Sequence, residues 1–287
     1  MSFVVDEPLK QSVNKLEGVI DFQNSFLIGG FVRDSLLGVR PLVKDLDIVT
    51  LTDFECFSSK LKEKQLEHSV YHKMLSSKVV LNGTIVDIVR ARKEFYLKPG
   101  SPTYCEPASI EEDSKRRDFT VNAIMIKLSE VVAGFCIPVD LVGGVDDLEK
   151  RLLRLIKPQA FKEDPSRMIR LIRYKVKLNF NVEEQTARLF KEAILGDILF
   201  STRSLRVILE LQRLFSESSA RKILDSLDDL ELPKCLILTK KFLASVGEAQ
   251  DFDSVLREGL KQQPSFQDFL VHFGFPQKRL NELKQER

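Results

Sequence analysis

The sequence predicts an α+β protein in which a mixed β-sheet domain precedes an all-helical region. Short apolar and β-branched runs separated by turn residues fill the first part of the chain, as expected for strands. After Pro165 the apolar residues recur at helical spacing only. The chain has enough apolar residues to form a globular core, since 43% of the 287 residues are hydrophobic and 30% are charged. We expect domain boundaries at 1–155, 156–215 and 216–287.

A strand, a glycine pair and a helix open the predicted sheet domain. Residues 26–31 are an apolar run that is interrupted at Gly29 and Gly30, and a helix is expected over 32–37. A second strand is expected over 46–51, where β-branched residues surround an acidic position. The glycine pair therefore stands where the chain changes from strand to helix.

A hairpin continues the predicted sheet. Asn82-Gly83 separates two apolar runs and is typical of a two-residue hairpin turn. A helix and three strands are expected here, at 54–65, 70–71, 78–81 and 84–89. The sheet is therefore mixed, with at least one antiparallel pair.

A long loop and then the helices follow. Lys93–Asp113 lacks periodicity and contains Pro99 and Gly100, which predicts a loop of the length that is often functional. A helix or strand is expected from Phe119 and a short helix from Asp146. Later helices are expected at 168–176, 183–195, 204–214, 221–227 and in the tail.

Composition excludes several classes of protein. The apolar stretch 131–139 is far shorter than the roughly 20 residues of a bilayer span. Asp6 and Glu7 occupy positions where a signal peptide needs a basic start. His68 and His72 have the spacing of a helical metal pair but lack the glutamate of a His-Glu-x-x-His motif, so we expect a surface role. With four dispersed cysteines and no Cys-x-x-Cys pair, the chain is expected to be cytoplasmic and reduced.

Basic residues are concentrated where the helical region begins. The net charge is only +2, but residues 150–177 hold ten Lys or Arg against Glu163 and Asp164. Such a stripe favours a polyanionic partner such as nucleic acid, because clustered Lys and Arg neutralise phosphates. A solvated helix face explains the same pattern, and both interpretations stay open at this point.

Asp45 and Asp47 are the strongest candidates for chemistry. Residues two apart on a strand project to the same face, so these carboxylates can bind the same metal ions. Hard oxygen ligands suit Mg²⁺, and a two-metal site suits phosphoryl or nucleotidyl transfer. Gly29 and Gly30 allow backbone N–H groups to approach a triphosphate closely. The combination points to a nucleotide-dependent enzyme.

Four motifs in order resemble the class II tRNA nucleotidyltransferases and the bacterial poly(A) polymerases of the DNA polymerase β superfamily. They span about residues 26–180. The four matching segments are Gly29–Gly38 with Asp45–Asp47, Arg116–Ala123, Asp140–Arg154 and Glu163–Arg170. This resemblance implies a nucleotidyltransferase head followed by a helical neck and a short body or tail.

The resemblance also implies roles for individual residues. Asp45 and Asp47 would be the catalytic metal ligands, and Asp87 stands where the superfamily often carries a third carboxylate. Glu163, Asp164 and Arg167 would select the base, with Asp164 and Arg167 imitating a Watson–Crick edge. The residues expected to bind the nucleotide are Gly29, Gly30, Arg33, Arg117, Asp118, Asn122, Asp164, Arg167, Arg170 and Arg173. For Arg117, ion pairing with Glu111, Glu112 or Asp113 is the competing structural interpretation.

The expected function is template-independent addition of CCA to the 3′ end of tRNA from CTP and ATP, with Mg²⁺ as cofactor. Within the class, poly(A) addition or partial CC or A addition is the alternative, although the Lys93–Asp113 loop disfavours an enzyme that adds only CC. Outside it, the alternatives are a non-catalytic RNA-binding protein and a small-molecule nucleotidyltransferase. About 70 residues follow Phe215, so we expect a shortened RNA-binding tail. The sequence does not fix the oligomeric state.

Overall fold

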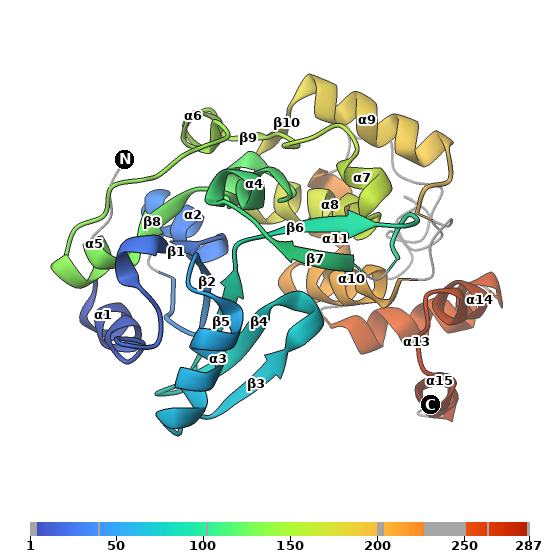
Figure 1. The fold of residues 1–287 in the computed structure, drawn as a ribbon. Helices are drawn as coiled ribbons and strands as arrows, with labels where there is room; N and C mark the ends of the chain where they lie inside the picture. Colours follow the sequence, from blue (N-terminus) through green and yellow to red (C-terminus); the bar gives the residue numbers. More distant parts are fainter. Residues whose placement is uncertain are drawn as a thin grey trace. The chain divides into compact units, whose positions relative to one another are not determined.

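The protein consists of two compact units, seen in a computed structural model (Figure 1). The structure describes residues 5–39, 41–101, 103–199, 204–226, 251–262 and 264–285. The first unit comprises Met1–Phe95, Thr103–Lys150 and Arg154–Lys157. The second comprises Tyr96–Pro102, Arg151–Leu153 and Pro158–Arg287. Each unit is described by itself below.

A six-stranded mixed sheet forms the centre of the first unit, with the order β3-β4-β5-β2-β1-β8 (Figure 1). Only β2 and β5 pair in parallel, and the other neighbours are antiparallel. The strands are β1 (Ser25–Ile28), β2 (Asp45–Thr50), β3 (His68–Tyr71), β4 (Ser76–Leu81), β5 (Thr84–Arg90) and β8 (Met125–Lys127). The predicted α+β class with an N-terminal mixed sheet is confirmed.

The predicted hairpin joins β4 to β5. Asn82 and Gly83 both have positive φ, 53° and 80°, as the two central residues of a type I′ turn require. Thr84 pairs with Leu81 directly beyond the turn. Because this turn fixes the register of β4 with β5, it also fixes which side chains of β5 project to each face of the sheet.

The described residues of the first unit form six α-helices. Side chains cap the N-termini of α3 and α4. Asp53 accepts a hydrogen bond from Cys56 N at the start of α3. Ser109 and Glu112 each accept a hydrogen bond from the other's backbone N–H at the start of α4, which forms a capping box. The helices are α1 (Glu7–Asn14), α2 (Gly30–Leu36), α3 (Phe54–Glu63), α4 (Ile110–Lys115), α5 (Leu128–Ala133) and α6 (Gly144–Glu149). Helices α1 and α5 were not expected from the sequence.

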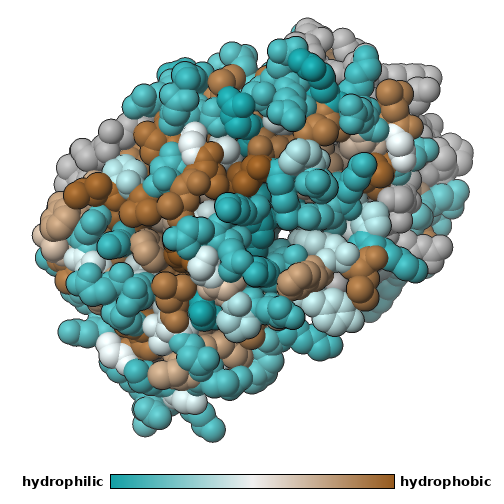
Figure 2. Space-filling model, turned by 45° about the horizontal axis from the view of Figure 1, so that its top comes forward, coloured by the Kyte–Doolittle hydropathy of each residue, from teal (hydrophilic) through white to brown (hydrophobic). Residues whose placement is uncertain are grey.

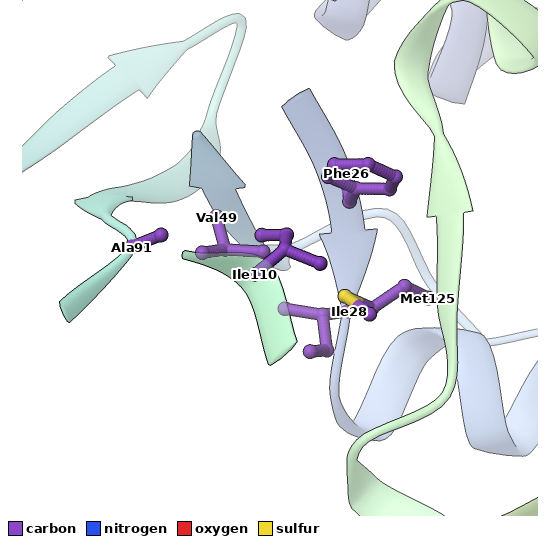
Figure 3. Packing of buried hydrophobic residues seen from close by; sticks show 6 residues of the cluster. All are labelled: Phe26, Ile28, Val49, Ala91, Ile110 and Met125. Atoms are coloured by element: carbon purple, nitrogen blue, oxygen red, sulfur yellow. The ribbon is translucent and has the colours of Figure 1, made fainter. Parts of the chain in front are cut away.

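A cluster of buried apolar side chains packs together in the first unit (Figure 3). Its members come from β1, β2, β8, α4 and the residue after β5, so it joins segments far apart in the sequence. They are Phe26, Ile28, Val49, Ala91, Ile110 and Met125. Burial of this kind contributes roughly 25 cal/mol per Å² of apolar surface. The cluster thereby stabilises the sheet that carries the candidate carboxylates.

The segment Lys93–Asp113 is largely regular, and its expectation as a long loop was wrong. Strands β6 (Arg92–Tyr96) and β7 (Thr103–Pro107) pair in a separate two-stranded sheet, and α4 follows. Pro99 and Gly100 mark only the turn between these strands, where Ser101 N donates to Lys98 O. The turn residues dominate the sequence pattern and obscure the two short strands on either side of them, since strand propensity is strongly context-dependent.

Where the structure describes the second unit, helices predominate and two short strands accompany them. β9 (Leu152–Leu153) and β10 (Asn181–Val182) pair in parallel, so the expectation of helices alone after Pro165 was incomplete. The apolar stripe of α8 is buried, as predicted. The helices are α7 (Ala160–Glu163), α8 (Ser166–Leu178), α9 (Glu184–Leu195), α10 (Leu205–Glu217), α11 (Ala220–Ser226), α13 (Phe252–Gln262), α14 (Pro264–His272) and α15 (Gln277–Gln285). Leu227 and Cys235 lie outside the described residues.

Two surface properties follow from these elements. Among the helices of the described ranges, none is both long enough and apolar enough to span a bilayer. Large apolar side chains are nevertheless exposed at several places on the surface (Figure 2). Phe135 and Ile137, between α5 and α6, are two of these exposed residues.

His68 and His72, which have the spacing of a helical metal pair, do not share a helix. His68 lies in β3, and His72 lies in the short 3₁₀ turn that follows it.

Gly144→Ala is expected to destabilise the first unit. A Cβ at this position would lie 2.3 Å from Thr120 O, a backbone atom that cannot rotate away. We expect the free energy of unfolding to fall by about 1–3 kcal/mol, the usual cost of overpacking. Urea denaturation measures it. Gly134→Ala is the control for backbone strain without a clash, because Gly134 has a positive φ of 89° and a Cβ there would meet nothing within 4 Å. A loss no larger than that of the control would contradict the steric argument.

Candidate active site

Three carboxylates of the first unit lie on one face of the central sheet. In β2 the side chains alternate, with Asp45 and Asp47 exposed and Leu46 buried. Asp47 is the register partner of Asp87 in the parallel β2–β5 pair. Paired residues of neighbouring strands project to the same face, so all three acids share it. Asp87 also forms an ion pair with Lys78, with Nζ and Oδ2 3.2 Å apart.

Gly29 allows the backbone to pass directly against Asp47. It has φ of 86°, and a Cβ built there would lie 2.9 Å from Asp47 Oδ2. Any other residue would face both a strained backbone and a clash with that carboxylate. Gly30 has no comparable constraint, since its Cβ would meet Arg33 Nη2 at 3.5 Å, an ordinary contact. The turn between β1 and α2 therefore depends on the first glycine of the pair.

Arg33, Asp118 and Asn122 form one buried chain of hydrogen bonds. The guanidinium of Arg33, only 2% exposed, pairs with Asp34 at 2.6 Å and donates to Asn122 Oδ1 at 2.6 Å. Asn122 Nδ2 in turn donates to Asp118 Oδ1 at 3.2 Å, which also accepts from Phe119 N. These predicted nucleotide-binding residues therefore hold the first two motifs together through their side chains.

Arg117 is anchored at one side and open at the other. Its Nε and Nη2 donate to Asp113 Oδ2 at 3.2 and 2.9 Å. Its Nη1 makes no hydrogen bond to the described residues, and 17% of the side chain is exposed. Burial lowers the pKa of this guanidinium, while the charges of Asp113 and Asp47 act to raise it. Arg117 thus has N–H donors left for an anion within electrostatic range of Asp47.

The donor set of the sheet face fits a hard cation only in part. Carboxylate oxygens are the ligands that Mg²⁺ prefers, and Gly29 keeps the space beside Asp47 Oδ2 free of a side chain. Within the described ranges, however, no group of three or more Asp, Glu, His or Cys is arranged to hold a metal ion. Mg²⁺ commonly binds through one or two carboxylates together with substrate phosphates. Asp45 and Asp47 fit that mode.

In the second unit, Asp164 is fully engaged within the chain. Its Oδ1 accepts from Ser166 N at 3.1 Å and from Ser166 Oγ at 2.6 Å, at the first residue of α8. Its Oδ2 accepts from Arg206 Nη1 at 2.7 Å. Arg167 Nη1 lies 3.4 Å from Glu163 Oε2. The predicted base-selecting residues therefore lie close together, with Asp164 and Arg167 buried and Glu163 partly exposed.

Arginines of α8 are paired with acids of α10, a pairing that the sequence did not lead us to expect. Arg173, 8% exposed at its side chain, bonds Glu210 and Glu217, both at 3.0 Å. Arg170 pairs with Glu210 at 3.3 Å. Because acids seven positions apart share one helix face, the spacing of Glu210 and Glu217 is a signal that could have found them. Much of the expected cationic stripe is consequently an internal ion-pair network.

Comparison with known proteins places these motifs in context. Residues 25–154 match the family model described as "Poly A polymerase head domain". An A-adding tRNA nucleotidyltransferase of Aquifex aeolicus is 33% identical over 206 residues, which are 70% of this chain and 24% of that protein. One of Halalkalibacterium halodurans is 33% identical over 75% of this chain and 50% of its own length. The chain thus spans between a quarter and a half of these relatives.

Other relatives carry different activities in their names. They include a CC-adding tRNA nucleotidyltransferase, a CCA-adding enzyme and a poly(A) polymerase I, all at 32–36% identity. A solved structure of a CCA-adding enzyme shares the fold, with a TM-score of 0.73, 26% identity, and 98% of this chain and 71% of that chain covered. Structures of CCA-adding enzymes with ATP, with CTP and with a tRNA also match.

Arg33→Lys is expected to destabilise the protein strongly despite the retained charge. A lysine has one nitrogen and cannot bond Asp34 and Asn122 in the geometry of the guanidinium. We expect the free energy of unfolding to fall by about 3 kcal/mol, as for other broken buried pairs. Chemical denaturation measures it. Arg188→Lys is the control, since its ion pair with Glu184 is exposed and worth under ~0.5 kcal/mol. Equal losses in both variants would refute the buried role.

Proposed function

Because the chain belongs to the family of class II tRNA nucleotidyltransferases and poly(A) polymerases, we propose that it adds CCA to the 3′ end of tRNA from CTP and ATP. The observation that carries the proposal is the pair Asp45 and Asp47 on the exposed side of β2, with Gly29 against Asp47. No template is needed when protein side chains select the base. As a tRNA-processing activity, it is assigned to the cytoplasm, with no membrane partner.

The reaction joins an RNA 3′ hydroxyl to a nucleotide. The hydroxyl oxygen attacks the α-phosphorus, the bond from that phosphorus to the β-phosphate oxygen breaks, and pyrophosphate leaves while the hydroxyl proton passes to solvent. Asp45 and Asp47, with Asp87 as a further candidate, would hold Mg²⁺. When bound, Mg²⁺ neutralises phosphate charge and favours ionisation of the attacking hydroxyl. The remaining work of the protein is positioning and charge stabilisation.

The other predicted residues have supporting roles in this proposal. Arg117 donates its open Nη1 to the phosphates of the nucleotide. Asp118 and Asn122 keep the sugar-binding segment in place from within the fold. Asp164 and Arg167 select the base, which requires atoms now engaged with neighbours to be shared with it or released to it. The proposed parts are a catalytic head (1–155), a base-selecting neck (156–215) and an RNA-contacting tail (216–287).

Addition of A alone is the second candidate. The A-adding relatives match over 70% and 75% of this chain, whereas the CCA-adding enzyme of Lactobacillus helveticus matches over 58%. Incubating tRNA that lacks its 3′ CCA with CTP, with ATP and with both separates the activities. The CCA proposal expects two C residues with CTP and a single terminal A only after them. A added to tRNA that already ends in CC, with no C incorporated from CTP into tRNA that lacks CCA, supports A addition alone, and long tails from ATP support a poly(A) polymerase.

Asp47→Asn is expected to abolish incorporation. Loss of one carboxylate removes charge from the proposed Mg²⁺ site, and we expect a decrease in kcat of roughly 10³-fold or more. Incorporation of labelled CTP measures it, and RNA binding in a filter assay should stay unchanged. Glu55→Gln is the control, because this exposed acid of α3 also removes one negative charge from the first unit. Full activity of Asp47→Asn would overturn the metal assignment.

Asp87→Asn tests the third carboxylate. Asp87 lies beside Asp47 across the parallel strand pair, so removal of its charge should weaken a cation held on that face. We expect incorporation to fall by at least roughly tenfold at low Mg²⁺ and to recover partly at high Mg²⁺. Lys78→Gln is the comparison, since it breaks the same ion pair but leaves the carboxylate. If both substitutions had equal effects, the ion pair and not metal binding would explain them.

A further inference from the structure

Arg117 belongs to a buried cluster of two carboxylates, Asp113 and Glu94, and three arginines, the other two being Arg92 and Arg116. Asp113, 1% exposed, accepts from Arg116 Nε at 2.9 Å and from Arg92 N at 3.2 Å through Oδ1, while Arg117 occupies its Oδ2. Both oxygens of this acid are therefore engaged by donors of the first unit. Burial opposes ionisation of Asp113, but Arg117 and Arg116 hold its pKa below the usual value. The surrounding donors therefore stabilise the ionised form of Asp113.

A second acid extends the cluster to the first strand of the two-stranded sheet. Glu94 of β6 accepts from Arg92 Nη2 at 2.8 Å and from Arg116 Nη1 at 2.9 Å, and its side chain is 8% exposed. Arg116 bridges the two acids, because its Nε bonds Asp113 and its Nη1 bonds Glu94. A continuous set of charged hydrogen bonds therefore runs from β6 through Arg116 and Asp113 to Arg117.

We expect this ion-pair network to position Arg117 more than to stabilise the fold. A buried ion-pair network contributes little net stability compared with apolar packing, but it fixes the geometry of its members. Two hydrogen bonds from Nε and Nη2 converge on Asp113 Oδ2, which restricts the guanidinium plane of Arg117 and leaves its Nη1 for another acceptor. An unanchored arginine would lose rotamer entropy on binding a ligand, which weakens the binding. Asp113 removes most of that entropy loss in advance.

We propose that Asp113 is a positioning residue that orients Arg117 toward the phosphates of the nucleotide, and that Glu94 supports it from β6 through Arg116. The inference rests on the proposed function, because it takes Arg117 as a phosphate ligand. In this proposal neither acid contacts the substrate, because both are buried and their oxygens are paired with arginines. The affinity for a nucleoside triphosphate consequently depends on residues that never touch it.

A double-mutant cycle on binding tests the anchoring. The dissociation constants of CTP and ATP are measured by calorimetry with Mg²⁺ for the full chain, Asp113→Asn, Arg117→Ala and the double variant. We expect Asp113→Asn to weaken binding roughly tenfold, the change that about 1.4 kcal/mol produces. In the Arg117→Ala background the same substitution should change nothing further. Glu111→Gln is the matched control on α4, because this exposed acid does not bond Arg117, and its affinity should stay at the wild-type value.

Different results contradict different parts of the argument. An Asp113→Asn effect of equal size with and without Arg117 overturns the anchoring, since the acid would then act by another route. Unchanged affinity in Arg117→Ala overturns the phosphate role of Arg117, and with it this part of the proposed function. If Asp113→Asn does not fold, Glu94→Gln keeps the test open, with an expected loss of roughly threefold that also vanishes without Arg117. Wild-type affinity in Glu94→Gln overturns the support from β6.

Discussion

The close approach of Gly29 to Asp47 is the constraint on which the rest of the first unit depends. The register of β1 with β2 pairs Ile28 with Asp47, so the chain that leaves β1 must turn directly beside this carboxylate. The β2–β5 register then brings Asp87 alongside. A slip of one residue in β2 would turn Asp47 toward the core and expose Leu46 or Ile48. The buried apolar cluster opposes such a slip, and so the hydrophobic pattern fixes the position of the acids.

Ion pairs inside each unit decide where the positive charge of the chain is available. Glu210 and Glu217 engage Arg170 and Arg173, and Asp147 engages Arg154, so these arginines of the basic segment are largely neutralised within the fold. Buried pairs of this kind cost desolvation energy that their attraction roughly offsets. Their benefit is a defined geometry. In the first unit the same principle holds Arg33 and Arg117, whose partners set the orientation of each guanidinium.

Local signals predicted much of the fold and part of the site. The Asn82-Gly83 turn, the apolar stripe of α8 and the shared face of Asp45 and Asp47 all follow from neighbours within a few residues. The pairing of β6 with β7 was not predicted, because Pro99 and Gly100 between them dominate the pattern and the two strands are short. The burial of Arg33 against Asn122 joins positions 89 residues apart, which spacing alone does not reveal. Motif resemblance identified these residues, but only the structure shows that they bind one another.

The central claim, that Asp45 and Asp47 hold a divalent cation together with nucleotide phosphates, is tested most directly by Mn²⁺ binding. Mn²⁺ takes the same oxygen ligands as Mg²⁺ and is visible by electron paramagnetic resonance. Titration with a non-hydrolysable CTP analogue present should show tight Mn²⁺ binding to the wild-type chain. Asp45→Asn with Asp47→Asn should weaken that binding at least roughly a hundredfold while the fold is retained. Equal Mn²⁺ affinity in the wild-type and doubly substituted proteins would contradict the claim.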